Sequence, residues 1–224
     1  MPRDRPERGT GPTARPAVAN RRSALAMLLS VAVGGCASDG GELMDVDYAR
    51  PLFDEAHFVP GVPSGTVPKK FRRQTVADPT GEPAGTVVVD TGARFLYLVQ
   101  PGGRAIRYGI GIGRDGFRWK GRATVGAKRE WPAWTPPPEM IARDPRLGAF
   151  GGAAGGMQGG TDNPLGARAL YLHQDGRDTL YRIHGTTDAG SIGSDVTSGC
   201  VRMLNLDVID LYGRVPRGAT VVVI

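Results

Sequence analysis

Residues 86–112 read TVVVDTGARFLYLVQPGGRAIRYGIGI and predict short β-strands joined by tight turns. The turn signals lie at residues 90–92 and 101–103, where glycine follows a residue that favours chain reversal. Between them, residues 94–99 include apolar side chains at both odd and even positions. A strand that is apolar on both faces is typical of one buried between layers. This stretch therefore predicts a layered β structure.

Toward the C-terminus we expect further strands and one helix. Short strands are predicted at residues 169–172, 179–183 and 219–224. The helix is predicted to begin with Asn205 as its cap and to end at Gly213. Its apolar face consists of Leu204, Val208, Leu211 and Tyr212. The expected fold is mostly β, a β-sandwich or β-barrel with one or two short helices.

Two segments between the predicted strands have unusual compositions. Residues 131–138 read WPAWTPPP, and their prolines exclude a central strand. This segment is either a wall that faces a ligand or a clamp whose indole rings pack inward. Residues 148–160 hold seven glycines around Met157 and predict a mobile loop or lid.

Residues 1–36 have the pattern of a bacterial export signal. A basic segment ending in Arg21 and Arg22 precedes an apolar stretch at residues 24–33, and two glycines then lead to Cys36. This ending resembles a lipobox, which predicts that Cys36 is lipidated, and a plain cleaved signal is the alternative. The arginine pair is compatible with twin-arginine export as well as with the ordinary secretion route. We expect an exported, lipid-anchored protein.

Residues 37–84 are rich in proline and glycine and are interpreted as a tether or as an N-terminal arm packed on the domain. As a flexible coil this segment would span roughly 40 Å. Phe53, Phe58 and Phe71 would favour docking of an arm. His57, the histidine of this segment, is expected to be exposed to solvent.

The composition fits one ordinary domain with extensions. The chain has 224 residues, 40% hydrophobic and 22% charged, which is enough to bury a core. Six of its arginines lie within residues 1–35, so from residue 36 onward 22 basic residues face 20 acidic ones. A nucleic-acid-binding domain would keep a basic face, so no nucleic acid partner is expected. The longest apolar stretch, residues 23–35, falls short of the about 20 residues that span a bilayer, which excludes a polytopic membrane protein.

Residues 183–203 read IHGTTDAGSIGSDVTSGCVRM and concentrate the reactive side chains. If Cys36 is lipidated, Cys200 is the one remaining thiol, and an unpaired cysteine in an oxidising compartment is a candidate nucleophile. His184 stands sixteen positions earlier, and the glycines between them would let the chain fold back. An imidazole beside a thiol lowers the thiol pKa and yields a thiolate.

The neighbours of Cys200 suggest further roles. Backbone N–H groups at Ser198 and Gly199 could form an oxyanion site, and Arg202 could bind a carboxylate in a bidentate manner. Taken singly, such residues are more often structural: an inert cysteine, a core histidine or a surface arginine. No acidic or thiol cluster accompanies His173 at ligand spacing, so we expect no metal site there. His173 lies beside Gln-Asp-Gly at residues 174–176, so we expect it to be exposed at a turn.

Three motifs in this segment occur in a characteristic order and spacing. They are His-Gly-Thr at residues 184–186, Ser-Ile-Gly at 191–193 and Thr-Ser-Gly-Cys-Val-Arg at 197–202. Together they resemble the active-site signature of the L,D-transpeptidase (YkuD-type) catalytic domain. The resemblance extends to residues 163–172 and 207–212 and covers residues 85–224. One variation is Ser198, where many members of the family carry a second histidine.

The resemblance implies a fold of the L,D-transpeptidase type and a reaction on peptidoglycan stem peptides. Cys200 would attack the carbonyl of the diamino-acid residue in a tetrapeptide and expel the terminal D-alanine. His184 would be the base, oriented by the backbone carbonyl of Gly185. The oxyanion would be held by the backbone N–H groups of Ser198, Gly199 and Cys200.

The same resemblance implies substrate-binding roles for Thr186, Thr197 and Arg202, and neither a metal nor a cofactor. The thioester would pass to an amine of a second stem peptide or of a protein, such as an outer-membrane protein, in the periplasm or cell envelope. Two alternatives stay open: an L,D-carboxypeptidase or peptidase in which water resolves the thioester, and an inactive cell-wall-binding lipoprotein.

Overall fold

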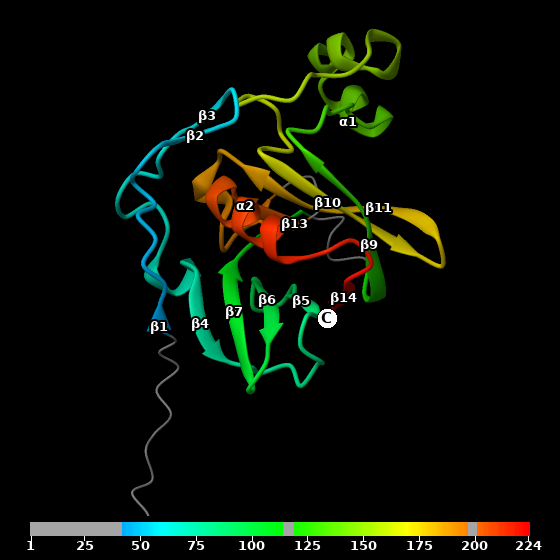
Figure 1. Cartoon of the computed structure of the whole chain (residues 1–224). Helices are drawn as coiled ribbons and strands as arrows, with labels where there is room; N and C mark the ends of the chain where they lie inside the picture. The colour runs from blue at the N-terminus through cyan, green and yellow to red at the C-terminus, as the bar shows by residue number, and fades with distance from the viewer. Residues whose placement is uncertain (1–41, 114–118, 197–200) are drawn as a thin grey trace, which may run out of the picture. The chain divides into compact units, whose positions relative to one another are not determined.

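The computed structural model describes residues 42–113, 119–196 and 201–224 (Figure 1). The predicted export signal, with its lipidation residue Cys36, lies outside the described residues. In the described ranges, none of the helices combines the length and the apolar character needed to cross a membrane.

The described chain is mostly strand, which confirms the predicted fold class. The strands are β1 (Glu42–Leu43), β2 (Leu52–Asp54), β3 (His57–Val59), β4 (Gln74–Ala77), β5 (Val87–Asp90), β6 (Phe95–Gln100), β7 (Arg104–Gly109), β8 (Gly111–Gly113), β9 (Gly121–Glu130), β10 (Arg168–Gln174), β11 (Arg177–Thr186), β12 (Asp195–Val196), β13 (Val201–Leu204) and β14 (Thr220–Val223). The helices are α1 (Pro138–Arg143), α2 (Asn205–Arg214) and the 3₁₀ helices η1 (Lys69–Phe71), η2 (Pro145–Phe150), η3 (Gly152–Ala154) and η4 (Ala189–Ser191). Each predicted strand overlaps an observed one.

The main sheet curls so that strands far apart in its order come together. The order is β1-β4-β7-β6-β5-β14-β9-β10-β11-β13-β8-β12. β7 and β8 are well separated in this order, yet only Ile110 lies between them along the chain. The two halves of the sheet therefore face each other across one core, to which Leu96 and Tyr108 contribute from one half and Val125 and Leu170 from the other.

Helix α2 covers β10, β11 and β13 (Figure 1), and three residues of its predicted apolar face, Val208, Leu211 and Tyr212, pack in or against the main core. Two details of the predicted helix are wrong. Asn205 does not cap it, because its side-chain Oδ1 accepts a hydrogen bond from the Ala167 N–H at 3.0 Å instead. The helix also continues through Gly213 to Arg214, so the glycine does not end it.

Strand β9 is the main element that the sequence pattern does not predict. It lies between β14 and β10 and pairs with both. Its sequence, GRATVGAKRE, contains two β-branched residues, Thr124 and Val125, and four charged residues. Such a composition has little strand preference of its own. The ladders on both sides, rather than local preference, make this segment a strand.

Residues 42–84 are packed on the domain as an arm rather than extended as a free tether. Strand β4 of the arm pairs with β7 and so extends the main sheet. A second, smaller core contains Tyr48, Val67, Phe71, Ile192 and Leu204. Of the three aromatic residues expected to dock the arm, Phe71 is buried, whereas Phe53 and Phe58 are 75% and 44% exposed. Apolar burial therefore attaches the arm around Phe71.

A buried charged cluster also fastens the arm to helix α2. Arg73 lies 2.5 Å from Asp210 Oδ1 and 3.7 Å from Asp207 Oδ1. Tyr48 donates to Asp207 Oδ1 at 2.8 Å, and Tyr108 donates to Asp210 Oδ2 at 2.6 Å. No described residue donates a hydrogen bond to Asp207 Oδ2, and burial of this 0% exposed side chain raises its pKa to about 7.

The Asp207→Asn variant is expected to change how stability depends on pH. The folded-state pKa of Asp207 lies above the value of about 3.9 in an unfolded chain, so this group stabilises the fold below pH 4, and that contribution is lost as pH rises toward 7. Asparagine cannot ionise, so the stability difference, variant minus wild type, should increase by up to a few kcal/mol between pH 4 and 8. Urea unfolding at several pH values across this range measures the free energy of unfolding of both proteins. If it depends on pH in the same way in both, the raised pKa of Asp207 is contradicted.

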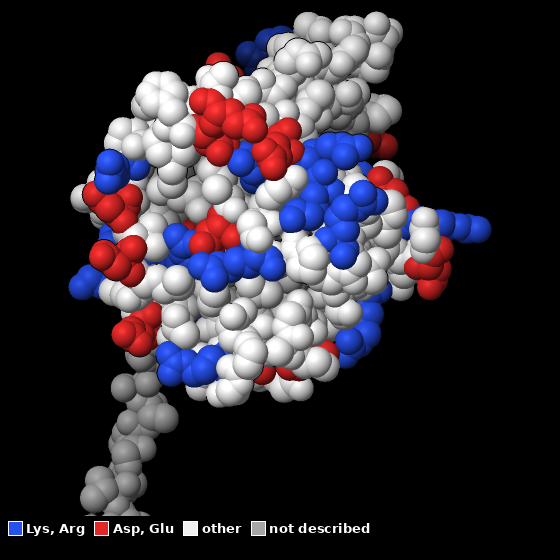
Figure 2. All heavy atoms as spheres, viewed as in Figure 1, with Lys and Arg blue, Asp and Glu red and all other residues white. Residues whose placement is uncertain are grey.

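Other charged side chains lie at the surface in mixed groups of both signs (Figure 2). Arg122 pairs with Glu82 at 2.6 Å, and Arg182 pairs with Asp178 at 2.7 Å. Solvent-exposed ion pairs contribute about 0–1 kcal/mol each. They therefore matter less to the fold than the buried cluster around Arg73.

Candidate functional site

Strand pairing places His184 between two neighbouring strands. Its Cα pairs with Ala169 of β10 on one side and with Arg202 of β13 on the other. The pairing of β11 with β13 is parallel, so the start of the predicted active-site segment lies beside its end. The fold thus brings His184, Gly185 and Thr186 next to the strand that directly follows Cys200 in the sequence.

The ring of His184 is buried and held in one orientation. It is 4% exposed, and its Nδ1 lies 2.8 Å from the carbonyl oxygen of Gly185. A carbonyl only accepts, so Nδ1 carries the proton and Nε2 is unprotonated in the neutral ring. Burial lowers the pKa of His184 to about 4, the Gly185 hydrogen bond opposes this, and the charges of Arg202 and Arg182 lower it further. At neutral pH the site therefore holds a neutral imidazole whose Nε2 is unprotonated and basic.

Gly185 is glycine because neighbouring atoms fill the space of a side chain. A Cβ at this position would overlap Asn205 Oδ1 and lie 3.1 Å from both Ala167 N and Val208 Cγ1. The Gly185 N–H donates to the carbonyl of Leu165 at 3.0 Å. The peptide groups on both sides of this glycine are therefore fixed, including the carbonyl that accepts from His184.

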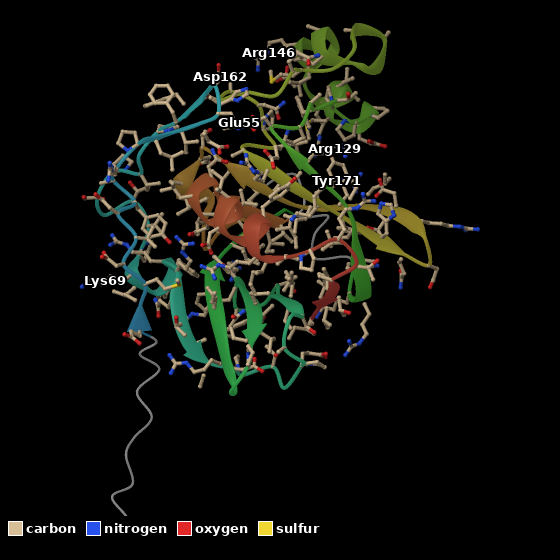
Figure 3. All side chains as sticks on the ribbon, viewed as in Figure 1. Glu55, Lys69, Arg129, Arg146, Asp162 and Tyr171 are labelled. Atoms are coloured by element: carbon tan, nitrogen blue, oxygen red, sulfur yellow. The ribbon has the colours of Figure 1, made fainter. Side chains whose placement is uncertain are left out.

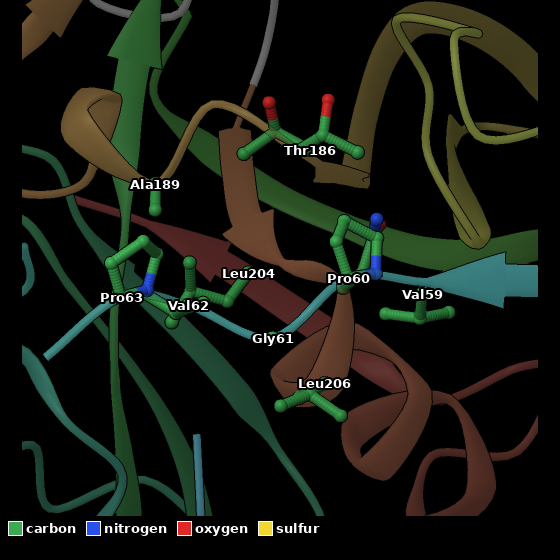
Figure 4. Close-up of a pocket in the computed structure, with 11 residues that line it drawn as sticks. Val59, Pro60, Gly61, Val62, Pro63, Thr186, Ala189, Leu204 and Leu206 are labelled. Carbon is green, nitrogen blue, oxygen red and sulfur yellow. The ribbon is translucent and has the colours of Figure 1, made fainter. Parts of the chain in front are cut away.

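Thr186 and Arg202 belong to the same face of the sheet as His184, since alternate and directly paired residues share a face. Thr186 is 8% exposed, and its Oγ1 accepts from the Asp188 N–H at 3.1 Å. Beside Thr186 lies a crevice of about 40 Å³ (Figure 4), whose opposite wall is formed by residues 59–63 of the arm. The arm therefore contributes to the surroundings of a predicted substrate-binding residue.

The Ser-Ile-Gly motif anchors the loop that leads from His184 toward Cys200. Ser191 Oγ donates to the carbonyl of Asp188 at 2.6 Å. Gly193 has a φ of 82°, donates its N–H to the Ile110 carbonyl at 2.9 Å, and leaves no room for a Cβ because the ring of Phe71 fills that space. The left-handed conformation and the close ring both require glycine.

The predicted nucleophile Cys200 and the other oxyanion residues, Ser198 and Gly199, lie outside the described residues, and so does Thr197, which is predicted to bind substrate. Strand β13 begins at the next residue, Val201. Within the part of the chain that the structure describes, no three His, Cys, Asp or Glu side chains gather where they could hold a metal ion. The part of the site that the structure describes holds the buried, neutral imidazole of His184, and Arg202 lies on the neighbouring strand β13.

Trp131, at the start of the proline-rich segment, adopts the clamp arrangement. Its Nε1 donates to Asp54 Oδ2 at 2.8 Å, and its indole stacks on the His57 ring with centroids 4.2 Å apart. Arg168 Nη2 donates to the other oxygen of the same carboxylate at 2.9 Å. His57 is therefore half-buried, contrary to the expectation that it is exposed. These contacts join the β2–β3 hairpin to the domain.

The glycine-rich loop forms part of an excursion between β9 and β10, which we call the crossover segment (residues 131–162). It contains α1, η2 and η3. Trp134 and Met157 exchange backbone hydrogen bonds of 2.8 and 2.7 Å across it. Thr161 Oγ1 donates to the Phe58 carbonyl at 2.8 Å, and Figure 3 shows Glu55 of the hairpin and Asp162 of the segment at the same end of the molecule.

The sequence pattern did not indicate two buried asparagines near His184, and it misplaced a second histidine besides His57. Asn163 and Asn205 are 3% and 5% exposed, and both hold the chain around Gly185. An Asn-Pro followed by glycine is typical of a side-chain-stabilised turn, which could have indicated Asn163. His173 lies within β10, half-buried over Gly126, rather than exposed at a turn.

Comparison with known proteins gives consistent matches. Residues 84–224 match the L,D-transpeptidase catalytic domain family (YkuD). Probable L,D-transpeptidase ErfK/SrfK of Escherichia coli K12 is 37% identical over 147 residues, which are 62% of this chain and 43% of that protein. Probable L,D-transpeptidase YbiS of the same strain is 32% identical over 188 residues, 80% of this chain and 58% of that protein. This chain spans about half the length of these relatives.

One similar solved structure comes from Brucella melitensis. It is described as a probable carnitine operon oxidoreductase, is 51% identical to this chain, and has a TM-score of 0.49. The match covers 67% of this chain and 92% of that one.

Proposed function

The chain belongs to the L,D-transpeptidase catalytic domain family, and from this premise we propose that it is a cysteine-dependent acyltransferase that acts on peptidoglycan stem peptides. The donor is a tetrapeptide stem, and the reaction releases its terminal D-alanine. The acceptor is an amine of a second stem peptide or of a protein. Export by the leader and lipidation at Cys36 would place the enzyme in the cell envelope, where these substrates occur.

The observation that carries the proposal is the hydrogen bond from His184 Nδ1–H to the Gly185 carbonyl. It leaves Nε2 free to accept a proton, in the arrangement that an acidic partner enforces in other catalytic triads. Because burial lowers the His184 pKa to about 4, the imidazole is neutral at pH 7 and can accept a proton at Nε2. His184 therefore acts as a general base during attack.

The proposed first half-reaction forms a thioester. Sulfur of Cys200 bonds to the carbonyl carbon while His184 takes the thiol proton, and backbone N–H groups of Ser198, Gly199 and Cys200 hold the oxyanion. The tetrahedral species then collapses, and its C–N bond breaks as His184 returns the proton to the departing D-alanine amine. The Gly185 carbonyl stabilises the intervening imidazolium.

The proposed second half-reaction restores the thiol. The acceptor amine attacks the thioester, His184 takes a proton from it, and the C–S bond breaks as that proton passes to Cys200. Arg202 suits a carboxylate of the stem peptide, and Thr186 and Thr197 would supply hydroxyls for its backbone groups. The crevice between Thr186 and the arm supports a substrate path along this face.

Intact-mass spectrometry of residues 37–224, a fragment that includes the whole compact unit from Asp39 to Ile224, tests the proposal. After incubation with a disaccharide tetrapeptide, we expect a covalent adduct lacking one D-alanine, free D-alanine, and a crosslinked dimer. An adduct followed only by shortened peptide would indicate a hydrolase under these conditions. Absence of any adduct would contradict an acyl-enzyme mechanism.

A further inference from the structure

We infer that Asn163 is a positioning residue for His184, and that it joins the crossover segment to the base of the proposed reaction. The inference rests on the proposed function for its catalytic meaning. Its structural basis is a continuous series of hydrogen bonds that starts at the Asn163 side chain and ends at the His184 ring.

The carboxamide of Asn163 holds three separated parts of the chain. Its Nδ2 lies within hydrogen-bond distance of three backbone carbonyl oxygens of the crossover segment: Pro132 at 3.0 Å, Met157 at 3.2 Å and Gln158 at 3.0 Å. Its Oδ1 accepts the Leu165 N–H at 2.9 Å. The residue is 3% exposed, so water cannot readily replace these bonds if the side chain is removed.

Leu165 passes this constraint to the catalytic strand. The N–H of Leu165 is held by Asn163, and its carbonyl accepts the Gly185 N–H at 3.0 Å. The Gly185 carbonyl in turn accepts from His184 Nδ1 at 2.8 Å. Two backbone residues, Leu165 and Gly185, therefore separate the Asn163 side chain from the imidazole.

The turn that contains Leu165 has little freedom to absorb a displacement. Gly166 adopts a φ of 62°, and a Cβ there would lie 2.6 Å from the carbonyl carbon of Gly185. On its other side, the Ala167 N–H donates to Asn205 Oδ1, and the Ala167 carbonyl accepts the Trp131 N–H at 2.8 Å. We therefore expect a shift of Leu165 to reach Gly185 through the 3.0 Å hydrogen bond between them.

The distinguishing test is the tautomer of His184. In the wild type, the Gly185 carbonyl selects the Nδ1–H form, whose Nε2 is the base. In Asn163→Ala, the displaced carbonyl should allow a mixture with the Nε2–H form, which cannot accept the thiol proton at Nε2. Nitrogen-15 NMR of the imidazole at pH 7 distinguishes the two forms. The acylation rate with tetrapeptide should fall about 10–100-fold, the range seen when a supporting hydrogen bond is lost.

Gln74→Ala is the matched control. Gln74 is also a buried carboxamide, 5% exposed, whose Nε2 donates to the Lys69 carbonyl at 2.8 Å and whose Oε1 accepts from Arg107 at 2.8 Å. These bonds organise the arm and do not connect to His184. We expect Gln74→Ala to lower the melting temperature while the tautomer remains Nδ1–H. Asn163→Ser, whose hydroxyl can still accept the Leu165 N–H, should restore part of the wild-type tautomer and rate.

The outcomes separate this inference from the proposed function. If wild-type protein forms no acyl adduct, the proposed function fails, while the tautomer comparison still tests the link from Asn163 to His184. If the wild type acylates but Asn163→Ala retains a pure Nδ1–H tautomer and loses no more activity than Gln74→Ala, the positioning role is overturned and the proposed function stands.

Discussion

Replacing Cys200 with alanine is expected to abolish both the covalent adduct and the release of D-alanine. An alanine methyl group cannot attack a carbonyl, and removal of a nucleophile from a catalytic unit typically costs more than about 10⁴-fold in rate. Beyond the leader cysteine Cys36, the chain has no other thiol to take its place. Intact-mass spectrometry and a coupled assay for D-alanine measure the two products directly.

Two controls make this result specific. A Cys36→Ala variant of the full chain should keep the adduct, because Cys36 belongs to the leader and not to the proposed site. Circular dichroism should show that Cys200→Ala retains the β-rich spectrum of the wild type. An adduct on Cys200→Ala, or unchanged D-alanine release, would mean that another group carries the chemistry.

The His184→Gln variant should acylate about 10²–10⁴-fold more slowly than the wild type at pH 7, which is the usual contribution of a general base. Glutamine approximates the size of the imidazole, so the buried position stays filled, but it cannot accept the thiol proton. Single-turnover mass spectrometry gives the acylation rate. His57→Gln is the matched control, because His57 stacks on Trp131 in the hairpin clamp and should leave the rate unchanged.

The pH profile separates loss of a base from general damage to the site. Burial holds the His184 pKa near 4, so the wild-type rate should be limited by imidazole protonation only near that pH. In His184→Gln the rate should follow the thiolate fraction and rise roughly tenfold per pH unit toward the ordinary thiol pKa of about 8.5. The difference in acylation rate between His184→Gln and the wild type should therefore decrease as pH rises. Parallel profiles would argue against proton transfer by His184.

The arm supplies contacts that lie outside the region matched by the family, residues 84–224. The matched region begins at residue 84, yet the arm before it supplies Phe71 against Gly193 and one wall of the crevice beside Thr186. The arm also supplies Arg73 to the buried cluster on helix α2. Studies of the catalytic domain should therefore keep the arm attached.

Local patterns in the sequence were sufficient for the fold class and for the order of the reactive residues. Turn residues and two-sided apolar runs in residues 86–112 predicted the β-strands that are observed. The spacing of His184 and Cys200, within motifs that lie close together in the chain, pointed to the family that the match at residues 84–224 shows. Such signals are readable because each depends on residues near one another in the sequence.

Tertiary structure alone decided which distant groups support that site. Strand β9 exists because β14 and β10 pair with it on both sides. The arm packs on the domain through the β4–β7 pairing, the burial of Phe71 and the contact of Arg73 with Asp207, which lies 134 positions away in the chain. The hydrogen bond from Asn163 to the Pro132 carbonyl joins residues that are 31 positions apart in the chain. The series of hydrogen bonds between the Asn163 side chain and the His184 ring runs through backbone groups of Leu165 and Gly185. Almost every residue carries the same backbone amide, so the sequence does not specify which backbone groups bind each other. The partners are decided by how distant parts of the chain come together around the core.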